Sequence, residues 1–198
     1  RRVSALFMAI TLVATFAHVS VGWGNGLRAD PLHTVATPNK GYFGTDITVM
    51  SLNSYNNGAR PVTIAKLANA VGADIVMLNE TTEGTAKLVA QLMEEAGSPM
   101  QMFQSAPSTR RGGDKLNQTV LLVSVYFGTY QVDEKITPQT SLGAVAVTPQ
   151  TRDANFRYLP TLVAGHVYPP NLLHTGRWRH EVKQMVDMCH SPQAGNLI

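Results

Sequence analysis

Cysteine and charged residues are both scarce in this sequence of 198 residues. The single cysteine, Cys189, excludes an intrachain disulfide framework and a zinc site built on cysteines. Because Cys189 falls in an apolar helical pattern, we expect its thiol to be buried and inert. Only 15% of the residues are charged and 44% are hydrophobic, a composition that predicts one domain with one sizeable core.

Long runs of basic residues are also missing. The formal net charge is +3 and the pI is near 9.1, a mild excess that suits anionic substrates without requiring nucleic acid. The arginines are scattered along the chain. Arg110 and Arg111 share a polar loop that could grip a substrate phosphate, but a solvated loop without a function is the favoured interpretation. The sequence shows no internal repeat and no low-complexity segment.

The first residues predict a membrane-directed segment. Arg1 and Arg2 precede an uncharged stretch from Val3 to Trp23, which is long enough for a transmembrane anchor and also fits a signal peptide. A buried amphipathic helix is the alternative. Residues 24–45 are rich in Gly, Asn, Pro and Thr and predict a linker, so the folded domain is expected over 46–198. Either membrane interpretation places this domain outside the membrane.

Strands and helices alternate along that domain. Pro61 and Gly72 mark the two ends of one predicted helix, and Thr81 or Thr82 caps a second helix that ends near Gly97. A third helix is predicted over 175–189. The apolar stripes of the three helices include Leu67, Leu88, Val186 and Cys189. Strands are predicted over 47–55, 73–79, 100–105, 119–127, 143–150 and 156–168, with the first as a central strand and the last two antiparallel. The mixture predicts an α+β domain with helices outside a sheet core.

Three polar residues stand where apolar strands end. Asn53 follows the first strand, Glu80 ends the second, and His166 ends a later one. If these strands are neighbours, the three side chains converge at one rim of the sheet. A carboxylate suits Mg²⁺, an amide can orient it, and a histidine can contact a phosphate or act as a general acid. Each residue alone is more simply an ordinary strand-end polar group; only the combination favours phosphoester chemistry.

The stretches ITVMSLNSYNN, ADIVMLNET and TLVAGHVYPPN, in this order, resemble the endonuclease/exonuclease/phosphatase superfamily, which has the DNase I-like fold. Asn79 stands where the family usually has glutamine, which leaves Glu80 in register. HVYPPN followed by GRWRHEVKQM resembles the membrane-anchored, extracytoplasmic members. The resemblance covers about Asp46 to Ile198 and implies a four-layer α/β/β/α sandwich.

The resemblance also implies a chemistry. Glu80 would bind Mg²⁺ or Mn²⁺, Asn53 would orient the site and the phosphate, and His166 would contact the scissile phosphate and assist the leaving oxygen. The implied function is hydrolysis of a phosphoester outside the membrane, with a lipid-linked phosphate as the substrate. The alternatives are a secreted or membrane-tethered nuclease and a non-catalytic binding remnant. Nucleic acid is a possible partner but not the favoured one. The chain is expected to be a monomer.

Two further motifs of the family do not occur in the sequence. The resemblance implies a strand that ends in Gly-Asp-Phe-Asn and a later Ser-Asp-His, and the chain stops at AGNLI where the first of these would begin. The chain also opens on Arg1 rather than Met. We therefore expect a domain that is incomplete at its C-terminus and inactive by itself.

Overall fold

The structure is a computed structural model that describes residues 47–55, 57–106, 118–150, 159–170 and 174–189. Several sequence-based predictions lie outside these residues: the membrane-directed segment 1–23, the linker 24–45, the arginines Arg110 and Arg111, and the C-terminal AGNLI. The part that the structure describes contains no helix with the length and apolar character needed to cross a membrane.

A four-stranded sheet forms the first half of the fold. Its strands are β1 (Val49–Asn53), β2 (Ile75–Thr81), β3 (Met100–Gln104) and β4 (Gln118–Ser124), in the order β1-β2-β4-β3. The β1 and β2 strands are parallel because helix α2 (Pro61–Val71) carries the chain back between them, and the other pairs are antiparallel. Helix α3 (Glu83–Glu95) connects β2 to β3.

The ends of these helices follow their sequence signals. Pro61 occupies the first turn of α2, and Gly72 ends the helix in the left-handed conformation with φ +63°. Thr82 is the N-cap of α3, where its Oγ1 accepts a hydrogen bond from Thr85 N at 3.2 Å. Both helix predictions are therefore confirmed.

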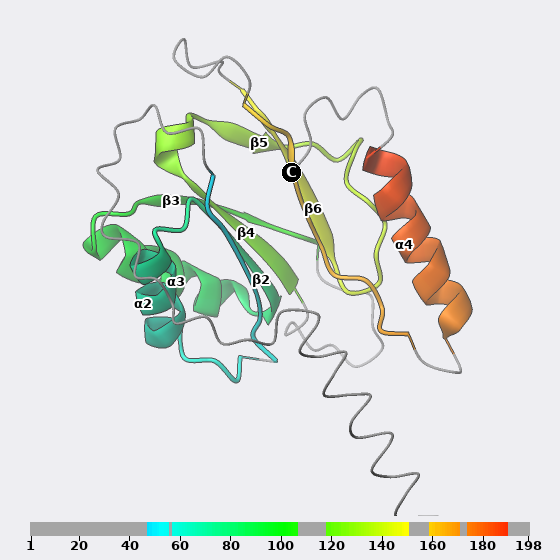
Figure 1. Cartoon of the computed structure of the whole chain (residues 1–198), viewed down its shortest axis with the longest axis horizontal. Helices are drawn as coiled ribbons and strands as arrows, with labels where there is room; N and C mark the ends of the chain where they lie inside the picture. The colour runs from blue at the N-terminus through cyan, green and yellow to red at the C-terminus, as the bar shows by residue number, and fades with distance from the viewer. Residues whose placement is uncertain (1–46, 56, 107–117, 151–158, 171–173, 190–198) are drawn as a thin grey trace, which may run out of the picture. The chain divides into compact units, whose positions relative to one another are not determined.

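A second, three-stranded sheet follows the short helix η1 (Val125–Phe127). It consists of β5 (Tyr130–Val132), β6 (Ala144–Pro149) and β7 (Leu162–Gly165), in the order β5-β6-β7. Both strand pairs are antiparallel, as predicted for β6 and β7. The last described element is helix α4 (Thr175–Cys189), which lies beside this sheet in Figure 1.

Two apolar clusters show how the sheets and helices are layered. One cluster joins α2 and α3 to the outer face of the first sheet, through residues such as Ile64, Val89 and Leu122. The other joins the two sheets, with Val123 from β4 packed among Val145 and Leu162. With α4 on the far side of the second sheet, the layers are helix, sheet, sheet and helix (Figure 1). The predicted α/β/β/α sandwich is confirmed.

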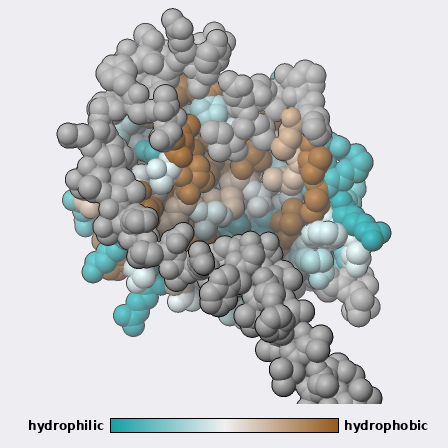
Figure 2. All heavy atoms as spheres, in the orientation of Figure 1, coloured by the Kyte–Doolittle hydropathy of each residue, from teal (hydrophilic) through white to brown (hydrophobic). Residues whose placement is uncertain are grey.

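Several burial predictions were wrong. Among the described strands, β1 is first in the sheet order, and its residues alternate between exposed and half-buried, so it is not central there. Leu67 and Leu88 are exposed, because α2 and α3 turn other residues, among them Ile64 and Met93, towards the core. Cys189 is also exposed, on the helix whose outer side, at the right edge of Figure 2, is hydrophilic. The predicted strand over 119–127 ends at Ser124, where the chain turns into η1.

Tyr130, the first residue of β5, links this strand to the segment before β7 through a buried hydrogen bond. Its side chain is buried, and its hydroxyl donates a hydrogen bond to Pro160 O at 3.1 Å. Burial raises the pKa of this phenol from 10.0 to about 12. The folded chain therefore keeps a proton that the unfolded chain releases above pH 10.

This difference predicts a loss of stability at high pH. The contribution of Tyr130 is fully present below pH 10 and is lost as the pH rises towards 12, by roughly 2 kcal/mol, because one pKa unit corresponds to about 1.4 kcal/mol. Urea unfolding followed from pH 9 to pH 12 measures it. Tyr130→Phe should start about 1 kcal/mol less stable and show a shallower decline with pH. Parallel curves for the two proteins would contradict the assignment.

Candidate functional site

The β1 and β2 strands bring the first two site residues together. The strands are parallel and Asn53 pairs with Asn79, so Glu80 comes one residue after this pair at the same end of the sheet. The register of β2 against β4 shifts between Leu78 and Thr81, which marks a bulge. Glu80 lies inside it with φ +52°, a conformation that bulky residues rarely adopt. The strained residue is therefore the one predicted to bind the metal.

Neighbouring polar groups hold this strained backbone in place. The buried Ser54 hydroxyl lies 2.7 Å from Glu80 O and 3.0 Å from Asn79 O, so it can donate to either. Asn57 N donates to Glu80 O at 3.3 Å, and Asn57 Oδ1 accepts a hydrogen bond from Thr82 N at 3.1 Å. The turn after β1 thus fixes the end of β2.

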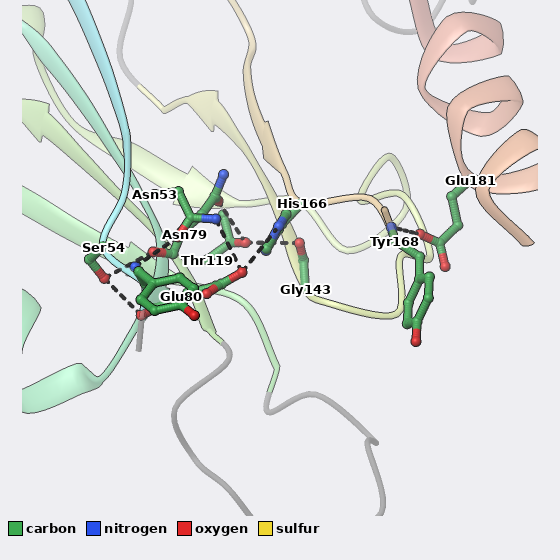
Figure 3. Close-up of polar contacts among 10 residues, drawn as sticks. Asn53, Ser54, Asn79, Glu80, Thr119, Gly143, His166, Tyr168 and Glu181 are labelled. Carbon is green, nitrogen blue, oxygen red and sulfur yellow. Dashed lines mark hydrogen bonds and ion pairs between the residues drawn. The ribbon is translucent and has the colours of Figure 1, made fainter. Parts of the chain in front are cut away.

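The side chains of Asn53 and Glu80 are in direct contact. Asn53 Nδ2 donates to Glu80 Oε1 at 3.1 Å, and Asn53 Oδ1 accepts a hydrogen bond from Tyr55 N at 2.8 Å. The second bond fixes the amide so that its donor faces the carboxylate (Figure 3). The structure thus brings Asn53 and Glu80 together, and the orienting role of Asn53 stays a prediction.

His166 approaches the same carboxylate from the second sheet. Its Nε2 lies 3.8 Å from Glu80 Oε1, and its backbone N donates to Gly143 O at 2.9 Å (Figure 3). The three residues thus converge, but not on neighbouring strands: β7 belongs to the sheet that faces β1 and β2. The prediction of one sheet rim was wrong because the sequence did not show that two separate sheets pack face to face.

Burial governs the charge state of His166. Loss of contact with water lowers the pKa of the imidazole below 6.5, although the nearby carboxylates of Glu80 and Glu181 act in the opposite direction. At neutral pH the ring is therefore mainly neutral, with one nitrogen that donates and one that accepts. Within the part of the chain that the structure describes, His166 Nδ1 has no hydrogen-bond partner.

A buried polar contact joins the two sheets beside this site. The Thr119 hydroxyl lies 3.1 Å from Asn79 Oδ1 and 3.0 Å from Gly143 O, and Gly143 O also accepts the bond from His166 N. These residues connect the end of β2 that carries Glu80 to the histidine. Thr119 and Gly143 were not among the predicted site residues, since nothing in the sequence indicates that either faces the other sheet.

Gly143 has no room for a side chain. Its φ is +101°, and a Cβ placed on it would lie 2.5 Å from Ser105 Oγ and 3.1 Å from Ser105 Cβ. We expect Gly143→Ala to destabilise the protein by about 3 kcal/mol, from backbone strain and from overpacking. Chemical denaturation measures the loss. Gly84→Ala is the matched control, because nothing lies within 4 Å of the added carbon; equal stabilities would contradict the prediction.

The Glu80 carboxylate is a suitable ligand for a hard divalent cation. Glu80 offers a partly exposed carboxylate, with 21% of its side chain accessible, beside an amide that orients it. Mg²⁺ is usually held by one or two carboxylates together with waters and substrate phosphates. Among the described residues, no three His, Cys, Asp or Glu side chains form a cluster that could hold a metal by themselves.

No family model matches the sequence, and no curated protein matches it. Solved structures with some similarity to this chain were found. The endonuclease domain of TRAS1, a telomere-specific non-LTR retrotransposon, is 16% identical, and the alignment covers 76% of this chain and 57% of that one, with a TM-score of 0.47. TDP2 from Caenorhabditis elegans is 15% identical over 75% of this chain and 44% of that one, with a TM-score of 0.48.

This chain thus spans about half the length of the solved structures to which it is similar. Its own layers, two facing sheets with α2 and α3 outside one and α4 outside the other, are those that the motif resemblance implies. The layered fold that the motif resemblance implied is therefore the fold that this chain has.

Proposed function

We propose that this domain, as part of its full-length protein, serves to hydrolyse phosphoesters with the help of a divalent metal ion bound at Glu80. The observation that carries the proposal is the convergence of three different side chains: the Glu80 carboxylate, the Asn53 amide at 3.1 Å and the His166 imidazole at 3.8 Å. A carboxylate, an amide and a histidine at one point suit a phosphate oxygen and its cation. The strained backbone of Glu80 supports a role beyond folding.

Each residue has a defined task in this proposal. Glu80 holds the cation, whose charge, when bound, offsets the negative charge that develops on the phosphate. Asn53 keeps the carboxylate in one orientation. His166, mainly neutral because burial lowers its pKa, donates a hydrogen bond from Nε2 to a phosphate oxygen. This task differs from that of a fully protonated general acid.

The substrate we favour is a lipid-linked phosphate outside the membrane. The support comes from the sequence, in which an uncharged segment follows Arg1 and Arg2. The mild positive charge suits an anionic substrate. We propose Mg²⁺ or Mn²⁺ as the metal and a monomeric, membrane-anchored or secreted enzyme.

The test is a hydrolysis assay on the full-length protein expressed from its native gene. The substrates are a polyprenyl pyrophosphate, double-stranded DNA and bis-p-nitrophenyl phosphate, each with Mg²⁺, with Mn²⁺ and with a chelator. We expect metal-dependent hydrolysis of the lipid-linked phosphate and a loss of about 100-fold in kcat for His166→Gln. Cleavage of DNA alone would identify a nuclease instead, and no cleavage of any substrate would favour a non-catalytic binding protein.

A further inference from the structure

Helix α4 is attached to the second sheet through a buried carboxylate. Glu181 is 3% exposed and is the one buried residue of this helix, all of whose residues are described. A charged group is costly to bury unless hydrogen bonds replace its water. Glu181 can therefore be buried only if hydrogen bonds from the protein replace those from water.

Both oxygens of Glu181 accept hydrogen bonds from loops of the second sheet. Oε1 accepts from the backbone N of Ser141 at 3.1 Å and from the Ser141 hydroxyl. Oε2 accepts from Tyr168 N at 2.6 Å (Figure 3). Bonds to an ionised acceptor are short and strong, so this one side chain holds two chain segments.

These two segments lie on either side of His166. Tyr168 comes two residues after it, and Ser141 comes two residues before Gly143, whose carbonyl oxygen accepts the bond from His166 N at 2.9 Å. Helix α4 also packs against the residue before the histidine: a Cβ on Gly165 would lie 2.9 Å from Met185 Cε. The backbone of His166 is thus fixed from both directions by contacts that lead to α4.

We propose that Glu181 is a positioning residue, which sets the place of His166 opposite Glu80 by holding the loops of Ser141 and Tyr168. The inference rests on the proposed function, because His166 must act on substrate for its placement to matter. Glu181 itself reaches neither the substrate nor the metal. Its effect should appear in turnover rather than in substrate binding.

The first test follows the His166 ring in the metal-free, full-length protein by NMR with labelled histidine, at one fixed pH. Glu181→Gln should shift the ring resonances, because an amide cannot accept from both loops. Ser141→Ala removes one donor and leaves the Glu181 charge in place, so it should shift them the same way by less. The matched control is Asp187→Asn. It removes an exposed charge of the same helix, which pairs with Lys183 at 2.6 Å, and should leave the ring resonances unchanged.

The second test measures hydrolysis by the same proteins. We expect Glu181→Gln to lower kcat about 10- to 100-fold with little change in KM, because small misplacements of a catalytic group are costly. An unshifted ring, or a shifted ring with wild-type kcat, would overturn the inference. A wild-type protein that hydrolyses nothing would refute the proposed function instead, and the ring resonances would still show whether Glu181 places His166.

Discussion

Replacement of Glu80 by Gln should abolish metal-dependent hydrolysis while leaving the fold intact. Glutamine keeps an oxygen that can accept the bond from Asn53 Nδ2, so the contact at 3.1 Å can survive. It removes the negative charge that a divalent cation requires at this point. We expect at least a 100-fold loss of Mg²⁺ affinity and about a 1,000-fold loss of kcat in the full-length protein, measured by titration calorimetry and by the hydrolysis assay.

Glu83→Gln is the matched control for this variant. Glu83 lies three residues further on and pairs with Lys87 at 2.6 Å on the exposed side of α3. Its loss should change neither metal affinity nor turnover, because an exposed ion pair contributes little. If Glu80→Gln bound Mg²⁺ as tightly as the wild type, the proposed metal site would be wrong.

Replacement of Glu181 by Ala should strongly destabilise the folded protein. It leaves three donors without their charged acceptor: Ser141 N, the Ser141 hydroxyl and Tyr168 N. Buried donors that lose their partner cost about 1–3 kcal/mol each, and water entering the space left by the side chain would reduce the total. We expect a loss of about 3 kcal/mol in the free energy of unfolding, measured by chemical denaturation.

Asp187→Ala shows what an exposed acid on the same helix contributes. Its carboxylate pairs with Lys183 and is 59% exposed, so we expect a change within about 0.5 kcal/mol. A Glu181→Ala protein as stable as Asp187→Ala would mean that the loops of the second sheet do not depend on the buried carboxylate.

Local features of the fold could be predicted from the sequence because each has a local cause. Pro61 and Gly72 fix the ends of α2 through their own backbone preferences, and Thr82 caps α3 with its own side chain. Glu80 was found because a carboxylate directly after an apolar strand is unusual. These signals depend only on neighbours in sequence.

Features that depend on distant contacts could not be predicted in the same way. Glu181 lies in a helix whose pattern directed attention to the apolar residues beside it, yet it is the residue that the loops bury. Strand β5 was missed because three residues carry too little pattern. The placement of His166 in the facing sheet depended on which strands pair, and strand pairing is decided by the whole chain rather than by one segment.

The buried polar contact that joins the two sheets, made by Thr119, Asn79 and Gly143, has a consequence for the order of folding. Asn53 and Glu80 are 27 positions apart and meet within one sheet, whereas His166 joins them only after the second sheet has docked. Contacts that close longer loops pay more entropy and tend to form later. We therefore expect the contact between Glu80 and Asn53 to form early in folding. The approach of His166 to Glu80 would follow later, when the second sheet docks on the first.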